Sequence, residues 1–374
     1  MNILFLIRAI GGGGGAERQL TELAKGLTFN GHQVTVAVLY GGGDFEAQLM
    51  ESGVQIIDLK KSGFWDISGF LTRYISALKR LRPDVLHGYM PMQNLLALLG
   101  KLFLPKTTRI AWGLRDSNIG YGSISMSRRI VFKLTCWLSP LVDVIISNSE
   151  AGKHFHVNNG YPANLIGVIH NGVDVDYFRR VETARLSMRQ KWGVSAEEVL
   201  VGNVARLDRK KDHPNFLRAC AILMQTQPRL KIVCAGEDSP EYRLELQSLA
   251  DDLRLQDRLI WAGLCDDMIS VYSALDLEVS SSLYEGFPNA VAEAMSCQVP
   301  VVATDAGDVK LMLDGVGICV PPGEPAALAE GMSVMLHGDL AAIGRASRER
   351  IVENYRIDKL VRQTEILLAI NDRC

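Results

Sequence analysis

Two glutamates, Glu285 and Glu293, lie eight positions apart in a segment whose residue types could bind a phosphorylated polyol. Between them Gly286-Phe287-Pro288 predicts a turn, and Asn289 followed by alanines predicts a helix with Asn289 as its N-cap. A helix N-terminus offers free N–H groups and a partial positive charge, which suit phosphate, and carboxylates beside it accept hydrogen bonds from hydroxyl groups. An ordinary capped helix with two solvated glutamates has the same local pattern.

A second cluster of charges follows the predicted strand Leu200–Val204. Arg206 and Lys211 lie five positions apart in a loop that leads into a helix. Arginine grips phosphate with a planar fork, and lysine acts as a mobile point charge. This loop could clamp a diphosphate, and the alternative is a solvated basic loop.

Five consecutive glycines, Gly11–Gly15, follow the first predicted strand. A loop without Cβ atoms lets backbone N–H groups approach a ligand closely, although a flexible turn is the simpler interpretation. No Lys-Ser or Lys-Thr follows the run, so an ATP-binding P-loop is not supported. The strand Val34–Val38 lacks an acidic residue at its end, which disfavours a dinucleotide site.

The chain alternates short apolar runs with helical patterns, which predicts an α/β fold with parallel sheets. Its 374 residues are enough for two domains, and a second series of strands begins near Val199. A tight turn at Asn171–Asp174 marks the expected boundary. The predicted strands are 3–7, 34–38, 54–58, 85–87, 109–112, 142–147 and 166–169 in the first half, then 200–204, 231–235, 259–261, 277–280, 299–303 and 317–320.

Composition narrows the class of protein. The net charge is −2, so the overall electrostatic potential of the protein does not favour the binding of nucleic acid. The seven cysteines are scattered without a CxxC pair, which indicates reduced thiols in the cytosol and argues against a zinc site. The apolar start Ile3–Ile7 is cut by Arg8 and predicts a strand, not a signal peptide, and Leu95–Leu104 is too short to span a bilayer. We therefore expect a cytoplasmic protein.

The segment from Asp276 through Glu285-Gly286-Phe287-Pro288-Asn289 and Glu293-Ala294-Met295 to Thr304 resembles the signature of the retaining enzymes of glycosyltransferase family 4. Gly14–Leu20 and Val204–His213 resemble two further segments of that family. The resemblance implies the GT-B fold, in which two doubly wound Rossmann-like domains face a central cleft. It assigns 1–174 to the acceptor-side domain, 175–356 to the nucleotide-sugar domain, and 357–374 to a helix that packs back on the first domain, with Leu360, Ile366 and Leu367 on its packing side.

The resemblance also implies roles for individual residues. Glu285, Arg206 and Lys211 would be catalytic, and Glu293 would accept hydrogen bonds from the nucleotide ribose. The residues implied in donor binding are Gly14, Gly15, Arg206, Lys211, Glu285, Gly286, Phe287, Asn289, Ala290, Val291 and Glu293, and those implied on the acceptor side are His87, Arg115 and Asn171.

Four positions depart from the family pattern. Ala205 and Asp212 stand where the basic segment usually has glycines, which leaves the charges in place but alters the expected backbone. Gln298 stands for another glycine beyond the helix, where we expect a changed turn and an intact site. Arg115 takes the place of a histidine, so no general base can be assigned.

The function implied is transfer of a sugar from a nucleotide-diphosphate donor, UDP-sugar above all, to a hydroxyl of a lipid-linked acceptor or growing glycan, with retention and without a metal or other cofactor. A sugar-nucleotide epimerase or phosphorylase of the same fold, or an inactive nucleotide-sugar-binding protein, are the alternatives. The basic and apolar segment 128–138 could lie on an anionic membrane surface, which would make the protein peripheral, or could be an amphipathic helix with a basic outer face.

Overall fold

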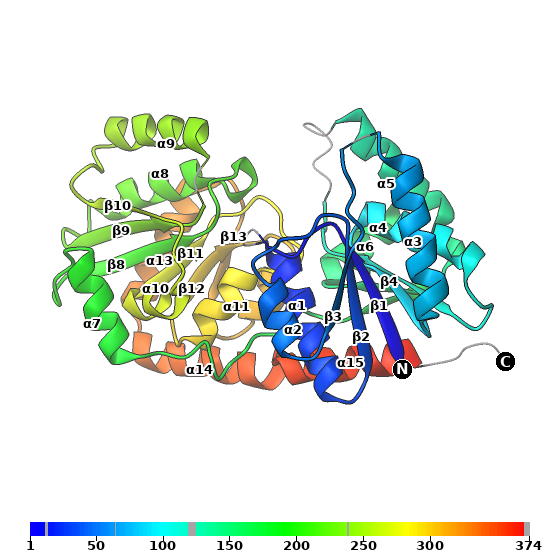
Figure 1. Cartoon of the computed structure of the whole chain (residues 1–374). Coiled ribbons are helices and arrows are strands. Elements are labelled where there is room, and N and C mark those ends of the chain that lie inside the picture. The colour runs from blue at the N-terminus through cyan, green and yellow to red at the C-terminus, as the bar shows by residue number, and fades with distance from the viewer. Residues whose placement is uncertain (12–13, 64, 119–124, 238, 370–374) are drawn as a thin grey trace. The chain divides into compact units, whose positions relative to one another are not determined.

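The computed structural model describes residues 1–11, 14–63, 65–118, 125–237 and 239–369. Gly12 and Gly13 of the glycine run and residues 370–374 of the C-terminal segment lie outside the described residues. The chain divides into two units, Met1–Gly172 with the C-terminal helix from Ile357, and Val173–Arg356. Each unit has one wholly parallel sheet with helices on both faces (Figure 1), because parallel strands need crossover connections.

The sheet of the first unit has the strand order β3-β2-β1-β4-β5-β6-β7. Side chains alternate along β1, so Ile3 and Phe5 pack beneath one layer of helices, whereas Leu4 and Leu6 pack beneath the other. The strands are β1 (Asn2–Ile7), β2 (Gln33–Val38), β3 (Gln55–Asp58), β4 (Val85–Gly88), β5 (Arg109–Leu114), β6 (Val144–Ser147) and β7 (Ile166–Val168). The helices are α1 (Gly15–Phe29), α2 (Glu46–Glu51), α3 (Ile67–Leu81), α4 (Pro91–Gly100), η1 (Lys101–Phe103), α5 (Met126–Leu138), η2 (Ser139–Leu141), α6 (Glu150–Asn158), η3 (Ala163–Leu165) and α15 (Ile357–Ala369).

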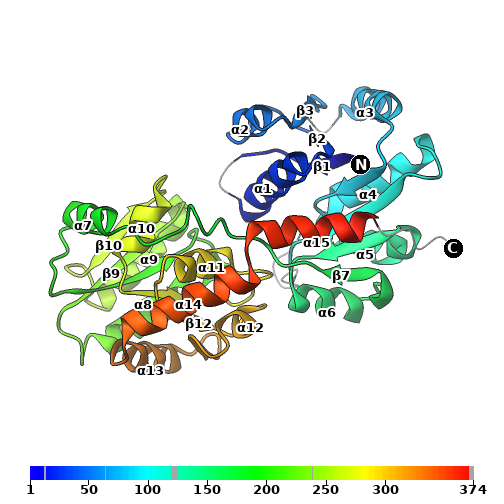
Figure 2. The ribbon, with the colours of Figure 1, turned by 90° about the horizontal axis from the view of Figure 1, so that it is seen from below.

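The last helix, α15, belongs to the first unit and packs beside α1 (Figure 2). Leu360, Val361 and Leu368 are buried in this contact. Ile366, which was predicted on the packing side, is 55% exposed, so that prediction was wrong. At 100° per residue the buried positions share one face of the helix, and position 366 falls on the opposite face.

The sheet of the second unit has the order β10-β9-β8-β11-β12-β13. The chain builds outward in one direction from β8 and then starts again on its other side with β11, so these neighbours form the topological switch point of the sheet. The strands are β8 (Val199–Val204), β9 (Leu230–Ala235), β10 (Leu259–Gly263), β11 (Leu277–Ser280), β12 (Val301–Thr304) and β13 (Ile318–Val320). The helices are α7 (Glu182–Lys191), η4 (Arg209–Lys211), α8 (His213–Leu223), α9 (Pro240–Asp252), α10 (Met268–Ala274), α11 (Asn289–Ser296), α12 (Val309–Leu313), α13 (Pro325–Leu336) and α14 (Leu340–Asn354).

Every strand predicted from the sequence is present, and its ends differ from the prediction by at most two residues. The apolar runs were informative because both faces of a parallel sheet are buried, so the strands stand out as continuous hydrophobic segments. The α/β, doubly wound prediction is confirmed in both units.

Candidate functional site

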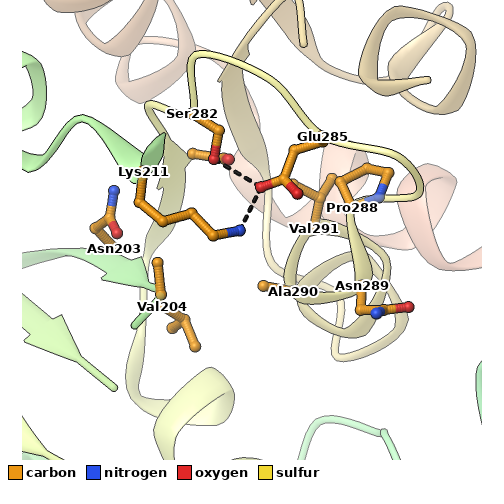
Figure 3. Close-up of a pocket in the computed structure, with 11 residues that line it drawn as sticks. Asn203, Val204, Lys211, Ser282, Glu285, Pro288, Asn289, Ala290 and Val291 are labelled. Atoms are coloured by element: carbon orange, nitrogen blue, oxygen red, sulfur yellow. Dashed lines mark hydrogen bonds and ion pairs between the residues drawn. The ribbon is translucent and has the colours of Figure 1, made fainter. Parts of the chain in front are cut away.

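A pocket lies at the carboxyl edge of the second sheet, at the switch point between β8 and β11 (Figure 3). Ligands of open α/β sheets bind at this edge because the crossover connections diverge there. Three segments line the pocket: the end of β8 with Lys211, the end of β11 with Glu285, and the start of α11. The lining residues are Asn203, Val204, Ala205, Lys211, Ser280, Ser282, Glu285, Pro288, Asn289, Ala290 and Val291.

Lys211 and Glu285, which are 74 positions apart in the chain, form an ion pair inside this pocket. Their side chains are 19% and 14% exposed. The Ser282 hydroxyl also donates a hydrogen bond to Oε1 of Glu285, at 2.7 Å (Figure 3). The pair therefore places one cation and one carboxylate, each partly shielded from water, on facing walls of the pocket.

The loop that carries Lys211 is attached to the end of β11. The Ser281 hydroxyl donates to the carbonyl oxygen of Lys211 at 2.7 Å, and the N–H of Leu283 donates to the carbonyl oxygen of Lys210 at 2.8 Å. Nδ2 of Asn203 donates to the Ser281 hydroxyl at 3.2 Å. Ser281 and Asn203 were not singled out in the sequence, since a serine or asparagine at a strand end carries no signal of its own.

Arg206 is exposed, and its side chain has no hydrogen bond or ion pair with any other residue that the structure describes. It lies outside the group that lines the pocket, although the neighbouring Ala205 lines it. The backbone of the loop is held by the N–H of Leu207, which donates to the carbonyl oxygen of Glu237 at 2.9 Å. The anchored loop thus carries an exposed guanidinium one residue from the pocket wall.

The helix α11 begins at Asn289, and Pro288 occupies the N-cap position without a side-chain cap. The prediction of Asn289 as N-cap was wrong, because Pro288 has the non-helical backbone of a cap (ψ 83°) and the helical conformation starts one residue later. The first N–H groups of the helix, at Asn289, Ala290 and Val291, lie in the pocket wall and have no partner within the helix. They supply the positive helix terminus expected of an anion site.

The turn Glu285–Phe287 is fixed by its close contacts with Gly307 and Tyr355. A Cβ atom at Gly307 would lie 2.3 Å from the carbonyl oxygen of Glu285, so only glycine lets the two backbones approach this closely. The Phe287 side chain is 4% exposed and packs with its ring 5.5 Å from that of Tyr355. Phe287 therefore anchors the turn in the core, and Gly286 and Phe287 can meet a ligand only through their backbone.

Glu293 is 7% exposed and does not line the pocket. Its Oε2 accepts a hydrogen bond from the Tyr272 hydroxyl at 2.9 Å. A second buried carboxyl, Glu278 on β11, lies in the same region, and it was missed because its neighbours in the chain read as an ordinary strand. Burial, followed by the charge of Glu293, raises the pKa of Glu278 well above its usual value.

Two of the positions that replace family glycines keep a backbone that glycine favours. Asp212 has φ 46°, and its side chain accepts from the N–H of Asn215 at 3.4 Å, so it also caps α8. Gln298 has φ 59° immediately after α11. Gln298 thus takes the left-handed conformation common after a helix C-terminus, at a cost of about 1–2 kcal/mol. The change of turn relative to the family stays a prediction.

The residues predicted on the acceptor side lie in the first unit. His87 is fully buried, its ring centroid is 5.1 Å from that of Phe5, and neither ring nitrogen has a partner among the described residues. Burial, with a smaller contribution from the charge of Arg115, lowers the pKa of His87 to about 3. A neutral ring in the core cannot contact an acceptor, so the structure assigns His87 to packing in this conformation.

Arg115 and Asn171 differ from His87 in their surroundings. The Arg115 guanidinium stacks over the ring of Tyr89, 3.9 Å from its centroid, and is partly exposed. Asn171 is 3% exposed in the loop after β7. The next residue, Gly172, exchanges two hydrogen bonds with the Gln19 side chain of α1, at 2.9 and 3.0 Å.

Gly14 and Gly15 lie at the start of α1, where Gly14 is the N-cap residue. A Cβ atom on Gly14 would lie 2.0 Å from Oε2 of Glu17, so glycine leaves room for that carboxylate beside the helix terminus. Both glycines belong to the first unit, and their role toward a donor stays a prediction.

Two family models match the chain. The model described as Glycosyltransferase Family 4 matches residues 13–177, and the model described as Glycosyl transferases group 1 matches residues 185–358. The chain belongs to the group 1 glycosyltransferases of family 4. The second match includes all of the residues that line the pocket.

Solved structures show that this glycosyltransferase has the GT-B fold. HepE of Anabaena, solved in complex with UDP-glucose, aligns with a TM-score of 0.86 at 22% identity and covers 99% of this chain and 100% of that one. Sucrose-phosphate synthase of Thermosynechococcus elongatus aligns with a TM-score of 0.81 at 19% identity, over 98% of each chain.

A curated relative is similar to this glycosyltransferase over most of its length. It is the N-acetylgalactosamine-N,N'-diacetylbacillosaminyl-diphospho-undecaprenol 4-alpha-N-acetylgalactosaminyltransferase of Campylobacter jejuni, 24% identical over 338 residues, which are 88% of each protein.

Proposed function

We propose that this glycosyltransferase moves a sugar from a UDP-sugar to a hydroxyl acceptor, with retention of anomeric configuration. The observation that carries the proposal is the Lys211–Glu285 pair, which lies at the switch point of the second sheet beside the start of α11. The pocket thus combines an ammonium group and the N-terminal N–H groups of a helix for a diphosphate with a carboxylate for sugar hydroxyls. The UDP-glucose complex of HepE, which has the same fold, supports the choice of nucleotide.

In the proposed reaction, the bond between the anomeric carbon and the phosphate oxygen breaks, and negative charge develops on the departing UDP. Lys211, Arg206 and the first N–H groups of α11 stabilise this charge, which is electrostatic catalysis by prearranged groups. Glu285 holds a hydroxyl of the donor sugar. The acceptor hydroxyl attacks the face that UDP leaves and gives its proton to the departing phosphate, so retention needs no covalent enzyme intermediate. The cations of the chain carry out this neutralisation, and we propose that no metal ion is required.

We propose a lipid-linked acceptor or a growing glycan on the cytosolic face of a membrane. The Campylobacter relative supports this choice, since its name specifies a diphospho-undecaprenol acceptor. Helix α5 with η2 supplies a surface for such a peripheral location, because it carries a stripe of exposed apolar side chains at helical spacing beside the basic Arg128, Arg129 and Lys133. The stripe consists of Met126, Ile130, Leu134, Trp137 and Leu141. Over the described residues, no helix combines the length and apolarity needed to cross a bilayer.

The test is a thermal-shift screen of nucleotides and sugar nucleotides, because a ligand that binds only the native state raises the melting temperature. UDP and one or more UDP-sugars should stabilise the protein, and GDP or ADP should not. The stabilising donor is then incubated with and without lipid-linked acceptors. Epimerised donor in the absence of acceptor would support the epimerase alternative, and stabilisation by no UDP compound would contradict the proposed donor.

A further inference from the structure

The strands β8 and β11 separate at the floor of the pocket. Their backbones pair only at Val201–Leu277 and Gly202–Glu278, whereas β8 continues to pair with β9 as far as Val204. Beyond Gly202, the edge of β8 that faces β11 has lost its backbone partner. Oε1 of Glu278 takes over, and accepts a hydrogen bond from the N–H of Val204 at 3.0 Å.

This single side-chain contact lies between two parts of the site. Val204, which Glu278 holds, lines the pocket and is the last residue of β8 before the loop with Arg206 and Lys211. Ser280, two residues after Glu278 on the same face of β11, also lines the pocket. Glu278 itself is 1% exposed, and its Oε2 has no hydrogen-bond partner among the described residues.

We propose that Glu278 is a positioning residue of the donor site. Its hydrogen bond to the Val204 N–H fixes the position of the end of β8 where the backbone no longer pairs with β11. It thereby sets where the loop begins that brings Arg206 and Lys211 to the diphosphate. The inference rests on the proposed UDP-sugar donor. Glu278 does not touch the donor; it acts through the Val204 amide.

The contact with Val204 needs only an acceptor oxygen, which both forms of a carboxyl group offer. Glu293 on α11 and Tyr272 on α10 are the titratable groups that face Glu278, and neither offers a positive charge. Burial, followed by the charge of Glu293, raises the pKa of Glu278, whereas the hydrogen bond from the Val204 N–H lowers it. A buried carboxyl group with a raised pKa lowers the stability of the folded protein as the pH rises above the pKa of the unfolded chain, because the same residue ionises freely there.

Because the buried carboxyl group lowers stability, the melting temperature and the UDP affinity of Glu278 variants together distinguish a positioning role from a purely structural one. Glu278→Leu removes the contact with Val204 and the buried acid together. We expect it to weaken UDP binding about tenfold by calorimetry, while the melting temperature at pH 8 stays the same or rises. Glu278→Gln keeps an acceptor for Val204 and is neutral, so it should restore UDP affinity to within about threefold of wild type. A residue needed only for folding would lower the melting temperature in both variants and leave UDP affinity of the folded protein unchanged.

Ser347→Ala is the matched control, since Ser347 is a buried polar residue of the same unit whose hydroxyl donates to the Val316 carbonyl away from the pocket. It should lower the melting temperature without changing UDP affinity. Wild-type affinity in Glu278→Leu would overturn the role of Glu278, and so would equal losses in the Leu and Gln variants. No UDP binding by the wild-type chain would instead overturn the proposed donor, and with it this role.

Discussion

Lys211 and Glu285 form an ion pair in the pocket at the carboxyl edge of the second sheet. In the proposed reaction, the diphosphate of the donor competes with Glu285 for the ammonium group, so that binding exchanges one carboxylate partner for phosphate oxygens. The ion pair fixes both side chains at the pocket wall, and groups fixed in this way need less reorganisation for the proposed reaction.

Replacement of Lys211 tests its role toward the leaving group. Lys211→Ala should reduce kcat/KM for sugar transfer by roughly 10²–10³, the usual loss when one stabilising group is removed. Lys210→Ala, one position earlier in the same loop, is the control for the loss of a positive charge and should retain most of the activity. Steady-state kinetics with the donor found in the screen would measure both, and wild-type turnover in Lys211→Ala would contradict the diphosphate assignment.

Replacement of Glu285 should separate binding from catalysis. Glu285→Gln frees Lys211 from its partner, so UDP should bind several-fold more tightly by calorimetry, whereas transfer should fall by about 10²-fold because the sugar loses its carboxylate. Glu245→Gln makes the same charge change on the surface, where Glu245 pairs with the exposed Arg209, and should alter neither property. Weaker UDP binding by Glu285→Gln would show that the ion pair helps to hold the nucleotide.

Glu293 should contribute to affinity through the ribose. Glu293→Ala should weaken UDP binding by about tenfold or more, since a hydrogen bond to a charged group contributes about 1.5–3 kcal/mol. The same substitution should change little in the binding of a UDP analogue that lacks the 2′ and 3′ hydroxyls. Equal losses for both ligands would assign Glu293 to the packing of α11 against Tyr272 instead.

The burial of His87 predicts how the free energy of unfolding changes as the pH falls. Because its pKa is about 3 when folded and near 6.5 when unfolded, the unfolded state takes up a proton first, and stability falls as the pH drops below about 6.5. At pH 5 the loss attributable to His87 is about 2 kcal/mol, from 1.5 units at about 1.36 kcal/mol each. Urea unfolding of His87→Leu at pH 7 and pH 5 should show a smaller loss than in wild type, and the same loss would contradict the buried neutral ring.

The apolar stripe of α5 should bind anionic membranes. Sedimentation with phosphatidylglycerol vesicles should capture the wild type, and phosphatidylcholine vesicles should capture less. Trp137→Ser should weaken binding by about tenfold or more, since burial of a large apolar side chain contributes about 1.5–3 kcal/mol. Leu186→Ser on α7, which is 62% exposed in the other unit, is the matched control. A stripe that forms a dimer in the absence of lipid, seen by ultracentrifugation, would contradict the membrane assignment.

The order of strands and helices could be predicted from sequence because parallel strands are buried on both faces and stand out as apolar runs. The pairing of Lys211 with Glu285 could not, because contact between residues 74 positions apart depends on which strands become neighbours. Residue spacing also placed Ile366 on the wrong face of α15 and the N-cap of α11 at the wrong residue. A shift of one residue is enough to change the face of a helix or the residue that caps it.

The amino-acid sequence by itself determined the α/β class and the family, because these depend on residue types and local spacing. It also supplied the candidate groups for a sugar diphosphate, whose role is proposed. Only the tertiary structure decided that His87 is a neutral core residue, that Phe287 anchors a turn, and that Glu278 replaces a backbone hydrogen bond beneath the pocket. Burial and the separation of two strands are properties of the packed sheet, and no local pattern encodes them.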